Sequence, residues 1–249
     1  MGESVLSAGF VRVDGALACD GVSLETIAHA AGTPTYVYSA ELVRQQYASL
    51  ARALAPVPHR IHYSVKANSS LAVLALLRSL GAGVDIVSGG ELFRALRAGF
   101  AGHDIVFSGV GKTERELAEA IDAGVLLVNV ESEGELHVLE RVAAGKNAVV
   151  PIALRINPEV TVETPHRYTR TGERGLKFGV PYARALEIAR LAESLPHIRL
   201  AGLDMHIGSQ VSSLDPYRDG MRKLLDLLGR LRALPGGAHD IRYLDIGGG

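Results

Sequence analysis

From residue 61 onward, short apolar runs alternate with amphipathic segments at a regular spacing. The predicted strands are 61–66, 84–88, 104–108, 125–130, 150–156, 200–207 and 241–246. The predicted helices between them are 70–80, 90–98, 113–123, 132–143, 181–194 and 217–233. A spacing of roughly 20–25 residues is typical of β-α units, which build a parallel sheet through right-handed crossovers. Seven units without a change of pattern favour a (β/α)8 TIM-type barrel, here incomplete, over an open doubly wound sheet.

The first sixty residues show a different pattern. Residues 5–24 predict two short strands around the turn at Asp14 and Gly15. A short helix is expected over 24–31, a brief β-rich run over 35–39, and a longer helix over 40–54. This segment therefore precedes the repeating units and lies outside their pattern.

The chain ends on a predicted strand followed by Gly247, Gly248 and Gly249. A closed barrel needs an eighth strand, because closure is what removes the open edges of the sheet. We therefore expect the sequence to be the N-terminal part of a longer chain.

Two predicted strands carry a basic side chain near their carboxyl ends. In HRIHYSVKAN the apolar Ile61, Tyr63 and Val65 alternate with polar residues, so Lys66 should face away from the helices. In LAGLDMHIGSQ the same alternation turns His206 toward that interior. Barrel enzymes keep their chemistry at this mouth. Taken alone, Lys66 is more simply a solvated lysine and His206 a satisfied core histidine. Together they favour a catalytic site.

Further polar groups are expected at the same mouth. Asp85 and Arg155 alternate with apolar neighbours and should point inward, and Glu91 should begin the next helix. The glycines 247–249 could bring backbone N–H groups close to a phosphate, with Ser209 adding a hydroxyl. The long polar segment 157–180 is expected to be a functional loop. An inward lysine, a histidine and a phosphate cradle suggest covalent binding of a phosphorylated aldehyde, with pyridoxal 5'-phosphate as the candidate cofactor.

One similar motif is rejected. Gly109-Val110-Gly111-Lys112-Thr113 ends like a Walker A loop, but Val106 stands where that loop needs its first glycine. We therefore do not expect nucleoside triphosphate binding, and Thr113 is predicted to cap the following helix.

Composition narrows the class of protein. The chain has 249 residues, of which 26 are basic and 27 acidic, so no net field favours nucleic acid or an anionic membrane. A single cysteine, Cys19, suits a reducing compartment. The first ten residues lack the pattern of a signal peptide, and no apolar run is long enough to span a bilayer. We expect a cytoplasmic protein that uses no metal.

Several sequence blocks, in order, resemble a known family. They are YSVKANSSLAVL, GAGVDIVSGGELFRALRAG, IVFSGVGKT, VNVESEGEL, LRINPEV, TRTGERGLKFGV, DMHIGSQ and LDIGGG. Together they are similar to the diaminopimelate decarboxylases, which belong to the alanine-racemase-fold group of pyridoxal-phosphate enzymes, with ornithine decarboxylase as a relative. The resemblance covers nearly the whole chain, including its first forty residues.

The resemblance implies roles for the candidate residues. Lys66 would bind the cofactor covalently, His206 would stack on its ring, and both would be catalytic. The phosphate would be held by Ser209, Gly247, Gly248 and Gly249. Asp85, Glu91 and Arg155 would orient the ring or His206. The implied reaction is decarboxylation of meso-2,6-diaminopimelate to L-lysine, the last step of lysine biosynthesis.

The resemblance also implies an organisation. Residues 1–34 would be strands and a short helix associated with a β-domain, and residues 35–249 would form the barrel, cut before its last strand. The family is usually a homodimer, and its remaining catalytic groups would lie beyond residue 249. Residues 1–249 alone are therefore expected to be inactive. Two alternatives are a decarboxylase of another basic amino acid and a non-catalytic homologue that acts as a binding partner.

Overall fold

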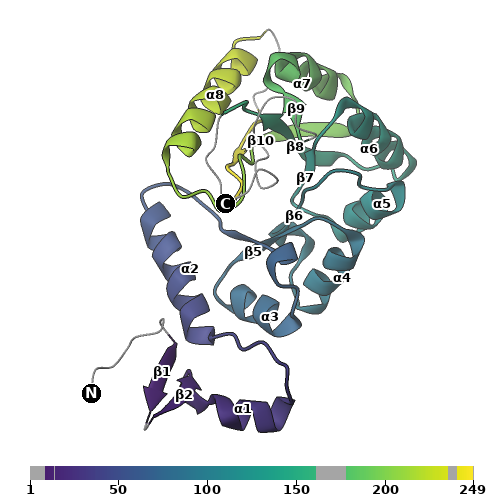
Figure 1. The fold of residues 1–249 in the computed structure, drawn as a ribbon. Helices are drawn as coiled ribbons and strands as arrows, with labels where there is room; N and C mark the ends of the chain where they lie inside the picture. The colour runs from purple at the N-terminus through teal and green to yellow at the C-terminus, as the bar shows by residue number, and fades with distance from the viewer. Residues whose placement is uncertain (1–8, 14, 161–177, 235–239, 249) are drawn as a thin grey trace.

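The computed structural model describes residues 9–13, 15–160, 178–234 and 240–248 (Figure 1). Its N-terminal part is a small antiparallel sheet made of β1 (Phe10–Val13), β2 (Ala16–Cys19) and β3 (Val22–Ser23). The first two strands confirm the predicted hairpin, with Phe10 opposite Cys19. The third was not predicted; it forms because the chain reverses at Asp20 and Gly21, both with positive φ.

Two helices connect this sheet to the barrel. They are α1 (Leu24–Ala31) and α2 (Ala40–Leu54), both at their predicted positions. Ser39 caps α2 by accepting a hydrogen bond from the Leu42 N–H, and it donates to Asp20 over 2.6 Å. The 35–39 run is not a strand, and Tyr36 within it is 91% exposed. The start of α2 is thus tied to the turn of the small sheet.

The main sheet is parallel and curled. Its strands are β4 (His62–Ser64), β5 (Gly83–Ile86), β6 (Ile105–Phe107), β7 (Leu127–Val130), β8 (Val150–Asn157), β10 (Ile198–Asp204) and β11 (Tyr243–Asp245). They follow one another in this order across the sheet, and each neighbouring pair is parallel. A short additional strand, β9 (Val180–Pro181), pairs with β8. The predicted incomplete barrel of seven strands is confirmed as a half-barrel.

Helices cover the outer, convex face of this sheet (Figure 1). They are α3 (Leu71–Ser79), α4 (Gly89–Arg97), α5 (Glu114–Ala123), α6 (Glu133–Gly145), α7 (Ala185–Ser194) and α8 (Asp215–Arg232). Three one-turn helices add to them: η1 (Val65–Ala67), η2 (Gly102–Asp104) and η4 (Tyr182–Arg184). Thr113 caps α5 in a full capping box with Glu116, as predicted.

The alternation of side chains along each strand separates the core from the interior of the half-barrel. Outward-facing residues such as Ile86, Phe107 and Leu154 are fully buried against the helices. The inward-facing residues at the base form a second, smaller apolar cluster: Val106, Leu127, Ala153 and Ala201. Above that cluster the inward positions become polar, and they lie at the carboxyl ends of the strands.

Several predicted strands end one to three residues early, and in β4 and β10 this affects a candidate residue of the site. Strand β4 stops at Ser64, and Lys66 lies in η1, where its side chain is exposed. The prediction that Lys66 sits on the strand itself is therefore wrong, because the chain tightens into a 3-10 turn and draws Val65 into the core. Strand β10 stops at Asp204, yet Met205 and Ile207 remain buried, so His206 keeps its predicted inward side.

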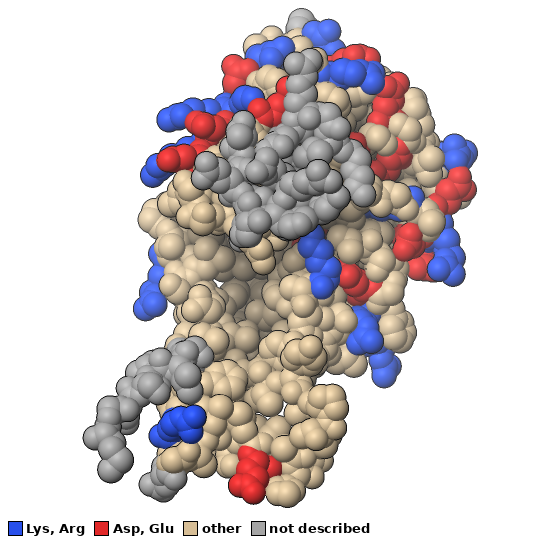
Figure 2. Space-filling view, in the orientation of Figure 1, with Lys and Arg blue, Asp and Glu red and all other residues tan. Residues whose placement is uncertain are grey.

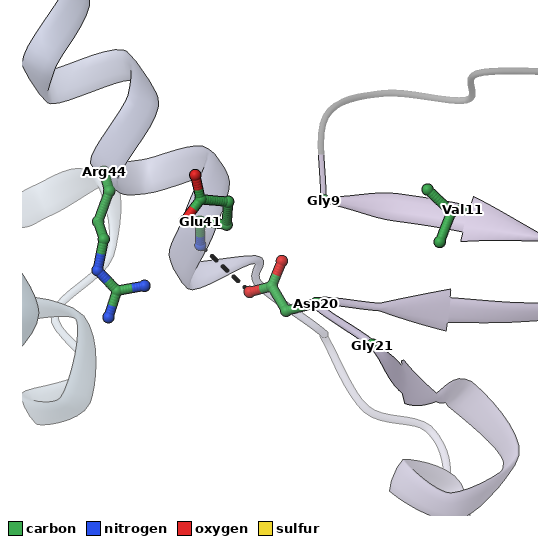
Figure 3. A pocket seen from close by; sticks show the side chains of 6 residues that line it. All are labelled: Gly9, Val11, Asp20, Gly21, Glu41 and Arg44. Carbon is green, nitrogen blue, oxygen red and sulfur yellow. Dashed lines mark hydrogen bonds between the residues drawn. The ribbon is translucent and has the colours of Figure 1, made fainter.

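The surface has two further features. Figure 2 shows that charged side chains gather over the helical rim and that the face is hollowed near its middle. Between the small sheet and α2 lies a cavity of about 400 Å³, lined by Gly9, Val11, Asp20, Gly21, Glu41 and Arg44 (Figure 3). Of the two carboxylates that line it, Asp20 already accepts hydrogen bonds from the Ser39 hydroxyl and the Glu41 N–H. None of the described helices is both long and apolar enough to cross a membrane.

Candidate active site

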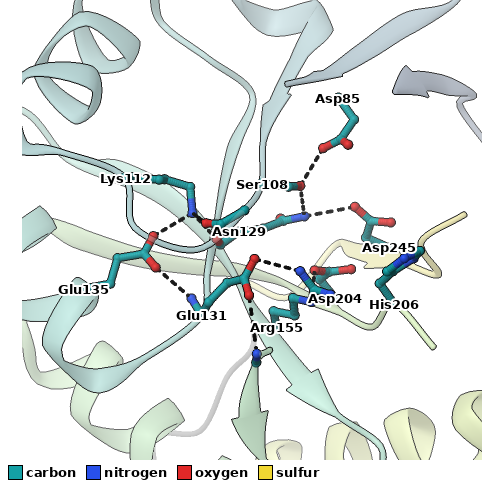
Figure 4. A network of polar contacts seen from close by, with 12 residues as sticks. Asp85, Ser108, Lys112, Asn129, Glu131, Glu135, Arg155, Asp204, His206 and Asp245 are labelled. Carbon is teal, nitrogen blue, oxygen red and sulfur yellow. Dashed lines mark hydrogen bonds and ion pairs between the residues drawn. The ribbon is translucent and has the colours of Figure 1, made fainter. Parts of the chain in front are cut away.

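A polar network fills the mouth of the half-barrel (Figure 4). Its members come from the carboxyl ends of successive strands, because parallel strands present those ends at one edge. They are Ser64, Asp85, Ser108, Asn129, Glu131, Arg155, Asp204, His206 and Asp245. All of them lie on the inward-facing side of their strands, above the apolar base.

Asp85 lies at the start of this network. Its carboxylate accepts hydrogen bonds from Ser108 over 2.5 Å and from Ser64 over 3.0 Å. Burial raises the pKa of Asp85 from its ordinary value to about 6, and the charge of Asp245 adds to that rise. The two serine hydroxyls and the Lys66 ammonium act in the opposite direction. The predicted inward position of Asp85 is confirmed, and its proton is held near neutral pH.

Arg155 forms the buried ion pair of the site. Its guanidinium donates to Glu131 over 2.7 Å and lies 3.9 Å from Asp204. The Phe178 ring lies 5.1 Å from the guanidinium carbon, a cation–π distance. Burial raises the pKa of Asp204 well above its usual range, and Asp245 raises it further while Arg155 lowers it. Glu131 also accepts from the Gly179 N–H, so the pair ties the β8 loop to β7.

His206 lies beside the glycine loop. The Gly248 N–H donates to His206 Nδ1 over 3.3 Å, so this ring nitrogen is an acceptor that faces the loop. Burial lowers the pKa of His206 to about 4, and the positive charges of Arg155 and Lys66 lower it further. The imidazole is therefore neutral at physiological pH and lies within reach of both cations.

The glycine loop itself is tightly fitted. The Gly247 N–H donates to Asp245 Oδ1 over 2.8 Å, and its φ is 70°. A Cβ atom at Gly247 would lie 2.6 Å from the Met205 carbonyl oxygen and 2.9 Å from His206 Nδ1. A Cβ at Gly248 would meet nothing within 4 Å. The backbone at Gly247 can therefore approach His206 only without a side chain, while Gly248 faces open space.

Lys66 lies close enough to the site for its charge to act on two other residues there. The ammonium lowers the pKa values of both Asp85 and His206, which belong to different strands. The curl of the sheet thus brings the turn after β4 near the end of β10. The structure brings Lys66, Asp85, Arg155, His206 and Gly247 to one mouth.

The remaining candidates are Glu91, Ser209 and Gly249. Glu91 accepts a hydrogen bond from the Val87 N–H at the start of α4, so it supports the end of β5. Ser209 is exposed beyond His206. Gly249 falls outside the described residues, as do residues 161–177 of the predicted functional loop.

Lys112, from the rejected Walker-like motif, has a clear structural position. Its ammonium donates to Glu135 and to the Gly109 carbonyl, both over 2.7 Å, and to the Asn129 carbonyl over 2.8 Å. Its side chain is only 1% exposed. Burial raises the pKa of its partner Glu135. This buried cation fastens the loop after β6 to the end of β7.

Sequence reasoning did not single out six members of the network: Ser64, Ser108, Asn129, Glu131, Asp204 and Asp245. The signal was present in the strand LVNVE, where Asn129 and Glu131 alternate with the buried Val128 and Val130. Asp245 precedes the glycines in LDIGGG, so it was within a block already singled out.

Comparison with known families identifies the family to which the chain belongs. Residues 40–249 match the family model described as pyridoxal-dependent decarboxylase, pyridoxal binding domain. The chain belongs to this family. The expected cofactor, pyridoxal 5'-phosphate, is thereby confirmed for the decarboxylase family to which the chain belongs.

Individual pyridoxal-dependent decarboxylases agree with the resemblance found in the sequence. The chain is 47% identical to the diaminopimelate decarboxylase of Pseudomonas aeruginosa over 236 residues, and also to that of Vibrio cholerae. Each alignment covers 95% of this chain and 56% of the relative. The Helicobacter pylori diaminopimelate decarboxylase, crystallised with L-lysine, superposes with a TM-score of 0.86 at 37% identity, covering 91% of this chain and 57% of that one. The chain thus spans just over half the length of these relatives.

The residues at the mouth fit the cofactor that defines this family. A phosphate needs a stretch of backbone that it can approach closely, and Gly248 faces open space with no side chain in the way. A flat aromatic ring can lie against a neutral imidazole, and His206 is neutral. An aldehyde needs an accessible amine, and Lys66 is exposed at the same mouth. The chemistry of these donors therefore matches an aromatic aldehyde that carries a phosphate.

Proposed function

We propose that the protein decarboxylates meso-2,6-diaminopimelate to L-lysine with pyridoxal 5'-phosphate. The observation that carries this proposal is the 47% identity to a diaminopimelate decarboxylase over 95% of the chain, joined to the grouping of Lys66, Asp85 and His206 at one mouth. L-Lysine, the product of this reaction, is the ligand named for the Helicobacter pylori structure. Because the chain spans 56% of its relatives, the proposal concerns the activity of the whole protein.

The chain's own residues would bind and orient the cofactor. Lys66 would hold the cofactor at its aldehyde group, and Ser209 with the glycines 247–249 would hold its phosphate. When bound, the cofactor supplies an electron sink for the pair released as the bond to the carboxylate carbon breaks. His206 packs its imidazole against the ring, and because it is neutral it adds no charge there.

Asp85 and Arg155 have supporting roles in this proposal. Asp85 lies within electrostatic reach of Lys66, and with a pKa of about 6 it can hold or release a proton beside that amine. Burial lowers the pKa of His206, and the fixed positive charge of Arg155 adds to that effect, so His206 stays deprotonated. Glu91 acts through the end of β5 and is a positioning residue.

The organisation of the whole protein is part of the proposal. We infer that residues 1–34 associate with a separate β-domain and that residues 35–249 form the cofactor-binding barrel. The family model begins at residue 40, which supports a boundary close to there. We further propose a homodimer that works in the cytoplasm, consistent with a chain that contains one cysteine.

The test combines an assay with a chemical map. Carbon dioxide release should be found with meso-diaminopimelate and should be at background with ornithine, arginine and lysine. Borohydride reduction followed by peptide mapping should place the pyridoxyl group on Lys66. Lys112 serves as the internal control, since its ammonium is buried and bonded to Glu135. A pyridoxyl group on Lys112, or release from ornithine at an equal rate, would overturn the proposal, and a protein that binds substrate without release would indicate a non-catalytic homologue.

A further inference from the structure

We propose that Asn129 is a positioning residue, which holds the loop Gly247–Gly248 in the shape that binds the cofactor phosphate. This inference rests on the proposed function, because it assigns that loop to the phosphate. Asn129 on β7 donates to Asp245 (Figure 4), which also accepts from the Gly247 N–H, and the adjacent Gly248 N–H donates to His206. The first member, Asn129, lies more than a hundred residues before the loop in the sequence.

Asn129 is fixed from both its backbone and its side chain. It is 1% exposed, and its carbonyl oxygen accepts from the buried Lys112 ammonium over 2.8 Å. Its amide nitrogen donates to Ser108 over 3.0 Å and to Asp245 Oδ2 over 3.1 Å. Within the described part of the chain, its Oδ1 atom has no hydrogen-bond partner. All the side-chain bonding of Asn129 is therefore directed through its amide nitrogen.

The contact with Asp245 sets the orientation of that carboxylate. One oxygen, Oδ2, accepts from Asn129, and the other, Oδ1, accepts from the Gly247 N–H over 2.8 Å. A carboxylate held at one oxygen cannot rotate without breaking that bond. Asn129 therefore keeps Oδ1 directed at Gly247, and it compensates part of the negative charge of Asp245.

The position of Gly247 in turn fixes the conformation of the loop Gly247–Gly248. Its backbone lies so close to Met205 and His206 that no Cβ would fit, and the adjacent Gly248 N–H reaches His206 Nδ1. A loop of glycines has little conformational preference of its own, so its shape depends on such bonds. Loss of the Asp245 acceptor geometry would release the Gly247 N–H and loosen the loop.

The test compares cofactor binding with and without the phosphate. The apoprotein is titrated by absorbance with pyridoxal 5'-phosphate and, separately, with pyridoxal. Removing one hydrogen bond to a carboxylate should weaken pyridoxal 5'-phosphate about tenfold in Asn129→Ala. The pyridoxal affinity should change less than about twofold, because pyridoxal does not use the loop. Asn129→Ser, whose hydroxyl is too short to bridge Ser108 and Asp245, should behave like the alanine variant and is used if the latter unfolds.

Two controls separate this role from general stability. Asn147→Ser makes the same change at an exposed position and should leave both affinities unchanged. In an Asp245→Ala background, Asn129→Ala should cause no further loss, because its effect passes through Asp245. Equal losses for both ligands, or additive losses in the double variant, would overturn the inference. If the unmutated protein fails to bind at Lys66, the proposed function falls; if it binds there and Asn129→Ala is unchanged, only this inference falls.

Discussion

Replacement of Asp85 by asparagine should stabilise the folded protein at neutral pH. Burial raises the pKa of this carboxyl from 3.8 to about 6, so the folded state binds the proton more tightly than the unfolded chain. For a raised pKa, that stabilisation is present in full below pH 3.8 and is lost as the pH rises through about 6. At pH 7.5 the ionised Asp85 therefore destabilises the fold, and the neutral amide removes that effect.

The size of the effect follows from the two pKa values. The difference between 3.8 and about 6 corresponds to about 3 kcal/mol, at roughly 1.36 kcal/mol per pH unit. Asp85 is partly exposed, so solvent screening reduces this to about 1–3 kcal/mol. The amide also fits the site: its oxygen accepts from Ser108, and its nitrogen donates to the Ser64 hydroxyl oxygen.

Urea unfolding of the apoprotein, followed by circular dichroism, measures this difference. Asp85→Asn should raise the free energy of unfolding at pH 7.5, and the gain should fall to about one third of that value at pH 4.5. Asp240→Asn is the matched control, because the Asp240 side chain is 64% exposed, and it should change little at either pH. A less stable Asp85→Asn protein at pH 7.5, or an equal gain at both pH values, would refute the reasoning.

Two further substitutions test other parts of the mouth. Glu131→Ala should lower the free energy of unfolding by about 3–5 kcal/mol in the same urea assay, because Arg155 would remain buried without its 2.7 Å partner; a loss below about 1 kcal/mol would contradict a buried ion pair. His206→Ala should weaken cofactor retention and slow turnover while the far-ultraviolet spectrum stays unchanged. Wild-type kinetics and cofactor affinity in that variant would show that His206 is only a core residue.

The fold could be predicted from the sequence because burial against the helices requires a regular alternation of apolar and polar residues along each strand. Each outward strand position must be apolar to pack against a helix, and Ile86, Phe107 and Leu154 follow that rule without exception. The helices carry the complementary period, so their bounds were predicted to within a few residues. Strand ends were less accurate, as Lys66 shows, because a single 3-10 turn changes the direction of the chain without changing the residue pattern.

The site was only partly accessible for a different reason. Lys66, Asp85, Arg155 and His206 each interrupt an apolar alternation and so stand out locally. Asn129 and Asp245 meet across the interior although 116 residues separate them, and that contact depends on the curl and register of the sheet. No local sequence pattern specifies that contact. Asn129 and Asp245 were therefore missed because their role depends on a contact between residues far apart in the sequence.

The charges at the mouth bear on the proposed orientation of the cofactor, with its phosphate at the glycine loop and its aldehyde at Lys66. The interior collects the carboxyls Asp85, Glu131, Asp204 and Asp245, and burial, with the nearby charge of Asp245, raises the pKa values of Asp85 and Asp204. A phosphate placed among them would be repelled, so the proposed position for it is the open side of Gly248, where a Cβ would meet nothing within 4 Å. The amine of Lys66 comes from η1, directly after β4, and β4 is at the opposite edge of the sheet from β11 and the glycine loop. Only the curl of the sheet brings these two edges near His206, so the proposed chemistry depends on the half-barrel and not on any single strand.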